Sequence, residues 1–346
     1  MATHLVYRLT NRGPKCTIKQ VSERRPTPDK HEVLVKIHAV SLNYRDIVIA
    51  NGTWPFPAKD NLIPCSDSAG KVVAIGSDVE GFAIGDKVVA AFDVATLYGP
   101  LKDWNHGHGG PIDGVLREYA AFPASVLVKI PSESKLGFPQ LSTLVCTGVT
   151  AWNALYGNIP LKPGQTVLFQ GTGGLSITGL ILAKAAEATT IITSSSSAKL
   201  ALVKSKYGVD HTINYKTTRN WAAKVNKITN NNGVVFILEN GGSGTIKQSL
   251  ECITAGGIIS VIGFLSPAKQ KDMPDVAGLA LAKGVVVRGI TVGNRNMLKD
   301  LVRFVAARGL ERPVDKTFGF EQAEVEAAYE YLKSGKHVGK VCISLE

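Results

Sequence analysis

The sequence has few of the features that mark a secreted, membrane-spanning or disulfide-bonded protein. No uninterrupted apolar stretch approaches the roughly 18 residues that a membrane-spanning helix needs. The opening residues, MATHLVYRLTNRG, lack the apolar core and the small-residue cleavage site of a signal peptide. The five cysteines are widely scattered and include no C-x-x-C pair, which argues against a disulfide framework and a four-cysteine zinc site. We therefore expect a protein of a reducing, cytoplasmic compartment that does not associate with membranes.

Acidic residues are also fewer than basic ones. The sequence has 28 Asp and Glu and 39 Lys and Arg, so the formal net charge is +11. Such a surplus suits nucleic acid, acidic membranes or phosphate-bearing small molecules. The densest basic segments are Arg24-Arg25 and Lys269-Gln270-Lys271, and neither is interleaved with the aromatic residues that a nucleic-acid stacking surface requires. We expect no dedicated nucleic-acid binding, because a polyphosphate cofactor accounts for the charge more simply.

The chain is long and apolar enough for two domains with their own cores, at 346 residues and 45% hydrophobic composition. Its first 130 residues are rich in loops and in short β-branched runs, such as 32–42, 71–79 and 86–92, as in a distorted antiparallel barrel. From about Thr166, apolar strands alternate with helical segments, which is typical of a parallel sheet covered by helices. The expected strands are 166–170, 189–194, 211–215, 233–240, 257–265 and 285–293. The predicted fold class is α/β.

The strongest local signal is a glycine-rich turn between the first of these strands and a helix, in TVLFQGTGGLSITG. Glycines at positions 171, 173 and 174 let the backbone turn sharply and approach a pyrophosphate, whose charge lies against the helix N-terminus. The fingerprint G-x-G-x-x-G is imperfect, because Ser176 occupies the position of the third glycine. The strand–turn–helix context nevertheless predicts dinucleotide binding.

The residue about 20 positions further on distinguishes the two nicotinamide dinucleotides. A site for NAD places Asp or Glu there, whereas this sequence has TSSSSAK at 193–199 and no carboxylate. Hydroxyls and a lysine favour a 2′-phosphate, so the sequence predicts NADP(H). Alternatively, Ser196 or Ser197 simply caps the next helix, and both roles are compatible because a helix N-terminus is itself an anion site.

Taken together, several segments resemble the medium-chain dehydrogenase/reductase superfamily, specifically its zinc-independent, quinone-oxidoreductase-like branch. They are SLNYRDIVIANGTWPFP, IPCSDSAGKVVAIGSDV, LVCTGVTAWNAL, GTGGLSITG, TSSSSAKL, GGIISVIGFL and GKHVGKVCI, in the family's order and spacing. The resemblance covers essentially the whole chain. It implies a GroES-like catalytic domain (residues 1–147 and 293–346) and a Rossmann NADP(H)-binding domain (148–292). It also implies a homodimer or homotetramer.

The resemblance assigns cofactor contacts residue by residue. Those at the pyrophosphate are Gly171, Thr172, Gly173, Gly174 and Leu175, and those at the 2′-phosphate and adenosine ribose are Ser194, Ser195, Lys199 and Tyr215. Those toward the nicotinamide are Asn240, Gly263, Phe264, Leu265 and Thr150, and Lys340 is a basic pyrophosphate contact. Alternatively, Tyr215, Phe264 and Leu265 are ordinary core or rim residues, and Lys340 is an exposed surface lysine.

The resemblance also predicts that the catalytic zinc of other relatives is missing. Of their ligand positions, the first falls in Leu42-Asn43-Tyr44 and the second is Ser66, so only Cys146 retains a thiol. A shifted set of Cys65, Cys146 and Asp67 is the alternative. The two histidines of the 92–111 segment, His106 and His108, are expected in a loop rather than at a metal.

Without a metal, hydrogen-bond donors must stabilise the negative charge that grows on a substrate oxygen during hydride transfer. We expect Tyr44 to donate a proton or hydrogen bond and Asn43 to orient it or a water. Alternatively to a role in this polar segment, Arg45 and Asp46 form a structural pair. Trp54, Phe56 and Trp104 offer flat apolar area for a conjugated substrate, or belong to the core.

The predicted function is therefore NADPH-dependent reduction of quinones or α,β-unsaturated carbonyls. Two alternatives stay open. One is a carbonyl or alcohol dehydrogenase of small metabolites, including an enoyl reductase of a biosynthetic pathway. The other is a cofactor-binding protein with a structural or interaction role and no turnover.

Overall fold

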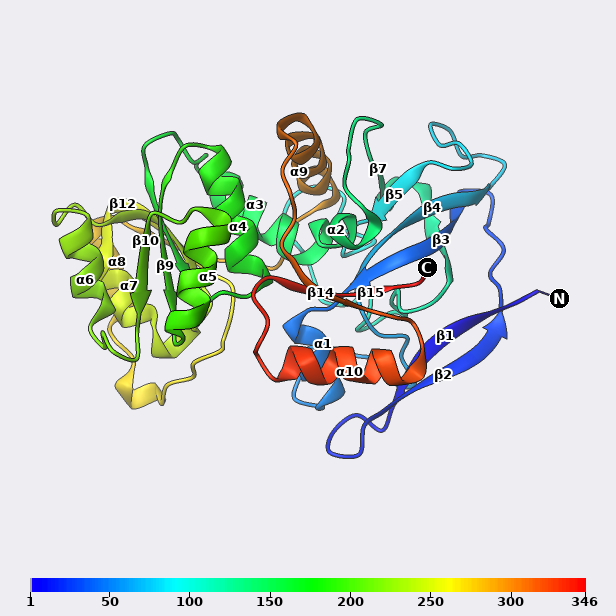
Figure 1. Ribbon diagram of the computed structural model, residues 1–346, viewed down its shortest axis with the longest axis horizontal. Coiled ribbons are helices and arrows are strands. Elements are labelled where there is room, and N and C mark those ends of the chain that lie inside the picture. The colour runs from blue at the N-terminus through cyan, green and yellow to red at the C-terminus, as the bar shows by residue number, and fades with distance from the viewer. Residues whose placement is uncertain (1) are drawn as a thin grey trace. The chain divides into compact units, whose positions relative to one another are not determined.

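The computed structural model describes residues 2–346, which form two compact units (Figure 1). One unit comprises the chain up to Val149 together with Val292–Glu346, and the other comprises Thr150–Thr291. The sequence analysis placed these boundaries at 147/148 and 292/293. Within residues 2–346, no helix is both long enough and apolar enough to span a bilayer.

The first unit is built on a seven-stranded, largely antiparallel sheet. Its main path runs β14-β15-β3-β4-β5-β7, and β6 pairs with β3 beside this path. The bounds are β3 Glu32–Ser41, β4 Asp67–Ile75, β5 Lys87–Ala90, β6 Tyr119–Pro123, β7 Leu127–Lys129, β14 Val314–Phe318 and β15 Lys340–Ser344. β1 (Thr3–Thr10) and β2 (Thr17–Arg24) form a separate hairpin. This is the expected GroES-like unit, in which chain segments from both ends share one sheet.

Helices of this unit connect and cover its strands. They are α1 (Tyr44–Ala50), α2 (Phe138–Ser142), α9 (Arg295–Arg308) and α10 (Gln322–Lys333), with a π-helical turn at Leu144–Gly148. The antiparallel pairing of β15 with β3 sets Cys342 opposite Ser41. Because of that pairing, Lys340 at the start of β15 lies beside the end of β3, where α1 begins.

One expected strand boundary in this unit was wrong. The β-branched run predicts a strand from Lys71 to Val79, whereas β4 begins at Asp67 and ends at Ile75. Ser68, Ala69 and Gly70 look like turn residues, yet each pairs with β3. At Gly70 a Cβ atom would lie 2.2 Å from Lys36 O, so close strand contact requires glycine there.

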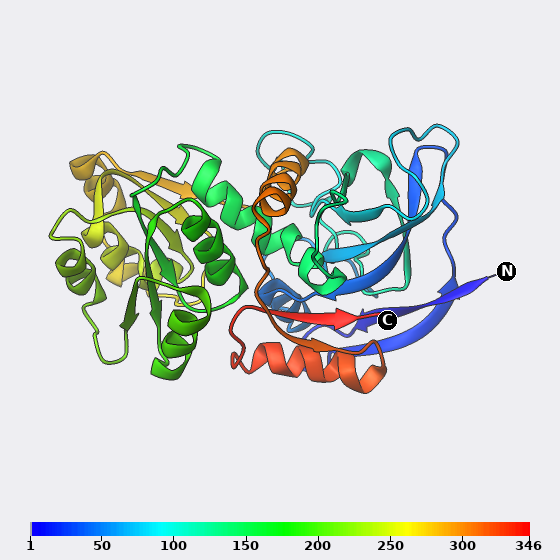
Figure 2. The same ribbon diagram turned by 45° about the horizontal axis from the view of Figure 1, so that its top comes forward.

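The second unit is built on a doubly wound sheet of parallel strands, which Figure 2 shows with its helices. The six strands lie in the order β10-β9-β8-β11-β12-β13. The strands are β8 Thr166–Gln170, β9 Thr189–Ser194, β10 His211–Asn214, β11 Val234–Glu239, β12 Ile253–Val261 and β13 Val286–Gly289. The parallel strands are joined by crossover connections, and helices lie on both faces of the sheet (Figure 1). The helices are α3 Val149–Tyr156, α4 Gly174–Ala185, α5 Ser197–Tyr207, α6 Trp221–Ile228, α7 Ile246–Cys252 and α8 Val276–Lys283.

The order of the strands reverses between β8 and β11, which is where such folds bind nucleotides at the carboxyl ends of the strands. The Rossmann architecture expected from the sequence is thereby confirmed. One strand is displaced: β12 ends at Val261 rather than Leu265, so Phe264 and Leu265 lie in the following loop and are more than half exposed. They are not core residues.

Candidate functional site

The glycine turn after β8 has room for a ligand against its backbone. Gly171 has φ +79°, a left-handed conformation that favours glycine. Gly173 has φ −76°, which any residue adopts, and a Cβ atom there would meet nothing within 4 Å. The protein's own packing therefore does not require glycine at this position, whereas close approach of a ligand would. The first-turn N–H groups of α4, which have no intrahelical acceptor, follow directly.

Ser176 occupies the third position of the glycine fingerprint and is held by hydrogen bonds. Its hydroxyl donates to Gln170 O at 2.7 Å and accepts from Asn240 Nδ2 at 3.0 Å. The glycine that allows close packing of helix on sheet is Gly179, three residues later. A Cβ atom at Gly179 would lie 2.7 Å from the Phe169 ring. The G-x-G-x-x-G spacing alone did not point to that position.

Glu239, at the end of β11, is fully buried and organises the neighbouring loop; sequence reasoning missed it. Its carboxylate accepts from Gln170 Nε2 at 2.7 Å and from the N–H groups of Gly241 and Gly242, both at 3.0 Å. The hydroxyls of Thr245 and Ser249 also donate to it. Five donors compensate the burial of this charge. The sequence feature that could have pointed to Glu239 is its position as a single acidic residue at the end of an apolar strand.

Two predicted cofactor residues belong to the same loop region. Asn240 Nδ2 also donates to Gln170 O at 2.9 Å, so this amide joins the ends of β11 and β8. Gly263 packs so closely on Asn240 that a Cβ atom would lie 2.4 Å from Asn240 O. Both residues therefore lie at the carboxyl edge of the sheet, the edge at which folds of this type bind nucleotides.

The segment after β9 contains hydroxyls, a lysine and no carboxylate. Ser194 is buried and its Oγ accepts from Ser196 N at 3.3 Å. Ser196 caps α5, because its Oγ accepts from Lys199 N at 3.3 Å. The capping interpretation of Ser196 is thus confirmed, and Ser195 and Lys199 remain partly exposed beside the cap. Tyr215, 42% exposed, follows β10, the neighbouring strand, and is not a core residue.

In the first unit, a buried polar cluster forms where β3, β4 and β15 meet α1. The Lys340 ammonium donates to Asn43 Oδ1 at 2.6 Å and to Leu42 O at 2.7 Å, and lies 3.6 Å from Asp67 Oδ2. Asp67 also accepts from Ser66 Oγ at 2.6 Å and from Cys146 N at 3.1 Å. The Asp67 carboxylate, the Lys340 ammonium and the Asn43 amide thus form one buried network of contacts inside the unit.

This geometry corrects one of the two interpretations of Lys340 that the sequence left open. The residue is only 3% exposed, so it is not a surface lysine. Its ammonium donates to Leu42 O and Asn43 Oδ1 and forms an ion pair with Asp67 at 3.6 Å. The contact of Lys340 with a cofactor pyrophosphate stays a prediction.

Asp46 and Arg45 extend the cluster along α1. Asp46 Oδ2 accepts from Asn43 N at 2.8 Å, and its Oδ1 lies 3.8 Å from Arg45 Nη1. Burial raises the pKa of Asp46 to about 6, although Arg45 acts in the opposite direction. Arg45 Nη1 also donates to His108 O at 2.9 Å, which anchors α1 to the loop before β6. The structural pairing of Arg45 with Asp46 is therefore observed.

The three aromatic residues expected to bind substrate pack on one another. Phe56 stacks on Trp104 at 4.0 Å between centroids, and Trp54 meets both edge-on at 5.2 and 5.9 Å. All three are partly exposed, so they are not core residues. The Arg45 guanidinium lies 5.6 Å from the Trp54 ring centroid, which links this cluster to α1. Tyr44, the first residue of α1, is 54% exposed.

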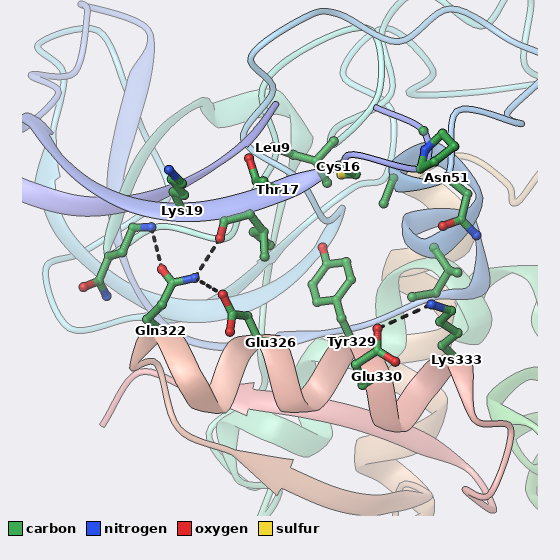
Figure 3. A pocket seen from close by; sticks show the side chains of 16 residues that line it. Leu9, Cys16, Thr17, Lys19, Asn51, Gln322, Glu326, Tyr329, Glu330 and Lys333 are labelled. Atoms are coloured by element: carbon green, nitrogen blue, oxygen red, sulfur yellow. Dashed lines mark hydrogen bonds and ion pairs between the residues drawn. The ribbon is translucent and has the colours of Figure 1, made fainter. Parts of the chain in front are cut away.

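A separate groove of about 870 Å³ lies between the β1–β2 hairpin and α10. Figure 3 shows Tyr329 rising from α10 beside Thr17 and Cys16, with Asn51 at the end of α1. Gln322 crosses the groove: its Nε2 donates to Ile18 O at 2.7 Å and its Oε1 accepts from Gln20 N at 2.9 Å. None of the residues predicted for cofactor or substrate lines it.

Comparisons with known proteins agree with this architecture. Residues 29–132 match the alcohol dehydrogenase GroES-like domain, and residues 174–307 match the zinc-binding dehydrogenase model. A zinc-type alcohol dehydrogenase-like protein of Schizosaccharomyces pombe is 42% identical over 320 residues, 91% of each chain. The chain belongs to the medium-chain dehydrogenase/reductase superfamily.

Further relatives of the superfamily extend the comparison. The crystal structure of a putative alcohol dehydrogenase from Sinorhizobium meliloti 1021 superposes with a TM-score of 0.90 at 36% identity, and covers both chains fully. An acryloyl-coenzyme A reductase of Metallosphaera sedula is 26% identical over 337 residues, 92% of this chain and 94% of its own. Enzymes of this superfamily use a nicotinamide cofactor.

The catalytic zinc of other medium-chain dehydrogenases does not fit the residues that this chain offers. An amide (Asn43), a hydroxyl (Ser66) and one thiol (Cys146) occupy the ligand positions, and burial raises the pKa of that thiol to about 12. Within residues 2–346, no three His, Cys, Asp or Glu side chains gather at metal-binding distance. The shifted set of Cys65, Cys146 and Asp67 is therefore not assembled either, and Cys65 Sγ lies 3.4 Å from the Tyr329 hydroxyl.

The two histidines of the 92–111 segment, His106 and His108, both contact groups of the protein itself. His106 Nδ1 lies 3.2 Å from Asp103 Oδ1 on an exposed turn. His108 is buried, and this burial lowers its pKa to about 4, so the ring is neutral at physiological pH. Its Nδ1 lies 3.2 Å from Asp113 O, in hydrogen-bond contact. These residues fix the loop that carries Trp104.

Proposed function

We propose that this protein is an NADP(H)-dependent oxidoreductase that reduces quinones or α,β-unsaturated carbonyls without a catalytic zinc. The observation that carries the proposal is the turn at Gly173, where glycine leaves open space that the protein's own packing does not use. A pyrophosphate at this turn would lie against the N-terminus of α4. Gly171, Thr172, Gly174 and Leu175 complete the turn.

The choice of NADP(H) rests on the segment after β9. Ser194, Ser195 and Lys199 surround the start of α5, and neither Asp nor Glu occurs from 193 to 199. A 2′-phosphate there would gain charge-assisted hydrogen bonds and the favourable end of the α5 dipole. Tyr215 and the loops that hold Asn240 and Gly263 border the same edge. Phe264, Leu265 and Thr150 remain proposed contacts on the nicotinamide side.

When bound, the reduced nicotinamide supplies a hydride to an electrophilic carbon of the substrate. This chain's own contribution is to bind the flat substrate and to meet the negative charge on its oxygen. Trp54, Phe56 and Trp104 provide the flat surface. The polar segment Asn43-Tyr44 provides hydrogen-bond donors, from the Tyr44 hydroxyl or the Asn43 amide.

Conjugated substrates suit this donor set better than alcohols do. A carbonyl conjugated to a double bond, or a quinone, accepts hydride and needs hydrogen bonds to its oxygen. An unactivated alcohol must also give up its hydroxyl proton to a base, and the Cys146 thiol, whose pKa burial raises to about 12, is neutral at physiological pH and cannot accept it. The relative named an acryloyl-coenzyme A reductase is consistent with conjugate reduction.

The test combines binding with turnover. Calorimetry with NADPH and NADH measures cofactor preference, and NADPH oxidation is followed spectrophotometrically with panels of quinones, enones, aldehydes and alcohols. We expect NADPH binding and turnover of quinones or enones. Turnover restricted to aldehydes and alcohols would favour the carbonyl or alcohol dehydrogenase alternative. Binding without any turnover would favour a structural role.

We also propose that the protein forms homodimers or larger homo-oligomers. Six of the eight residues of α8 are apolar, none of the eight is buried, and Leu281 is 85% exposed. The adjacent β13 is an edge strand of its sheet, and its outer edge can pair with a second copy. Light scattering coupled to size-exclusion chromatography measures the mass, and Leu281→Lys should shift it toward the monomer.

A further inference from the structure

The side-chain amide of Asn43 is oriented by its contact with Lys340. Oδ1 of Asn43 lies 2.6 Å from the Lys340 ammonium, which can only donate hydrogen bonds. The oxygen of the amide must therefore face Lys340, and the NH₂ group must face the other way. Lys340 is itself fixed by Leu42 O and by Asp67.

The NH₂ group of this amide is a buried donor without an acceptor. Asn43 is 6% exposed, and its Nδ2 has no hydrogen-bond partner within residues 2–346. A buried donor left without a partner is destabilising, so buried donors are nearly always satisfied in native proteins. An amide held in place by other polar groups, with its donor unused, is the arrangement expected of a ligand-binding group.

The backbone at this position is held as well. The Asn43 N–H donates to Asp46 Oδ2 at 2.8 Å, and Asn43 O accepts from Asp46 N at 2.9 Å. The residue is thus fixed through its main chain by Asp46 and through its side chain by Lys340. Tyr44, the other donor of this segment, is 54% exposed and lacks comparable burial. Donors that stabilise developing charge are effective when they are preorganised.

We infer that the Asn43 amide N–H donates to the substrate's carbonyl oxygen, and that Lys340 is a positioning residue that aims this donor. The inference rests on the proposed reduction of conjugated carbonyls and reassigns the main donor from Tyr44 to Asn43. The positive charge of Lys340 behind Oδ1 also polarises the amide, which makes its N–H a stronger donor. The substrate class that this donor recognises is a neutral carbonyl whose oxygen becomes negative during reduction.

The sharpest variant is Asn43→Asp. Aspartate keeps an oxygen for Lys340 and for the polar cluster, but it replaces the N–H donor by an acceptor that repels a substrate oxygen. We expect kcat/KM for 2-cyclohexenone with NADPH to fall about 100-fold or more. The Kd for NADPH should stay within about twofold. The matched control is Asn51→Asp, the same change at the exposed C-terminal end of α1, which should leave kcat/KM unchanged.

The role of Lys340 is tested by Lys340→Met and Lys340→Arg, alone and combined with Asn43→Asp. Lys340→Met should lower kcat/KM about 10-fold, and Lys340→Arg should recover part of the loss. In the Asn43→Asp background, Lys340→Met should cause little further loss, because a positioning residue acts only through the residue it positions. Additive losses would show that Lys340 acts independently of Asn43. If Lys340→Met does not fold, Lys340→Gln replaces it.

A spectroscopic readout separates this inference from the proposed function. The carbonyl stretch of 2-cyclohexenone, ¹³C-labelled at the carbonyl, is recorded in complex with the protein and NADP⁺, which cannot deliver a hydride. A frequency lowered in the wild type and restored in Asn43→Asp supports the inference. Equal frequencies and equal kcat/KM in both proteins overturn it, because the N–H then holds only water. A wild type that binds neither cyclohexenone nor NADPH overturns the proposed function and the inference together.

Discussion

Gln170, the last residue of β8, donates from Nε2 to the fully buried carboxylate of Glu239, the last residue of β11, at 2.7 Å. β8 and β11 are the neighbouring strands at which the order of the sheet reverses. The hydrogen bond therefore joins the two strand ends that border the proposed nucleotide site. The same carboxylate also fixes the turn at Gly241 and Gly242.

Glu239→Gln should destabilise the second unit and weaken cofactor binding. The amide NH₂ of glutamine would face donors where the carboxylate now accepts, so at least one buried hydrogen bond is lost. We expect a loss of about 2–4 kcal/mol in the free energy of unfolding, measured by chemical denaturation. Glu251→Gln, an exposed residue of α7, is the control. Equal unfolding free energies for both variants would contradict a central role for Glu239.

Lys199→Ala should weaken NADPH binding about 10-fold and leave NADH binding nearly unchanged. The lysine lies in the first turn of α5, where its charge would meet a 2′-phosphate that only NADPH carries. Calorimetric titration with both dinucleotides measures the two constants. Lys204→Ala, on the same helix but further from its start, is the control for charge. A loss of equal size for both dinucleotides would instead indicate packing or general electrostatics.

The Rossmann unit could be predicted from the sequence because its signals are local. Each strand is a run of four to nine residues that contains β-branched residues, and the glycine turn follows β8 directly. The helix–sheet contact at Gly179 was missed because the fingerprint expects glycine at Ser176. In this chain a hydrogen-bonded serine occupies that position. The close contact between α4 and the sheet occurs three residues later, at Gly179.

The polar cluster of the first unit could be predicted only in part. The types of residue at 43, 44 and 66 were enough to argue against zinc ligands. The contact between Lys340 and Asn43 could not be read from the sequence, because it joins residues 297 positions apart through the pairing of β15 with β3. The burial of Lys340 likewise depends on that pairing, which is why an exposed surface position was one of the alternatives that the sequence left open.

Trp104→Leu should raise the KM for flat substrates more than for small ones. Phe56 stacks on Trp104, so removal of the indole opens the aromatic surface and removes contact area. We expect KM for a naphthoquinone to rise about 5- to 10-fold, and KM for acrolein to change less than twofold. An equal rise for both substrates would show that the loop, rather than the aromatic surface, is affected.

The buried carboxyl of Asp46 should make stability depend on pH between 4 and 6. Its pKa in the folded protein is raised to about 6, from an ordinary value of 3.8. Between these values the folded chain keeps a proton that the unfolded chain has released, so stability falls as pH rises and levels off above 6. The shift corresponds to about 3 kcal/mol. Denaturant unfolding of Asp46→Asn should lack this decline, whereas Asp60→Asn, with an exposed carboxyl, should retain it.

Chelation should leave the proposed reductase activity intact, and purified protein should contain zinc well below one atom per chain. The positions that bind catalytic zinc in other members of the superfamily offer an amide, a hydroxyl and a thiol whose pKa burial raises to about 12. A neutral thiol must release its proton before it binds zinc, and burial opposes that step. Elemental analysis before and after dialysis against a chelator, with activity followed in parallel, measures both quantities. One zinc per chain, lost together with activity, would show that Cys146 and Asp67 hold a metal in spite of their neighbours.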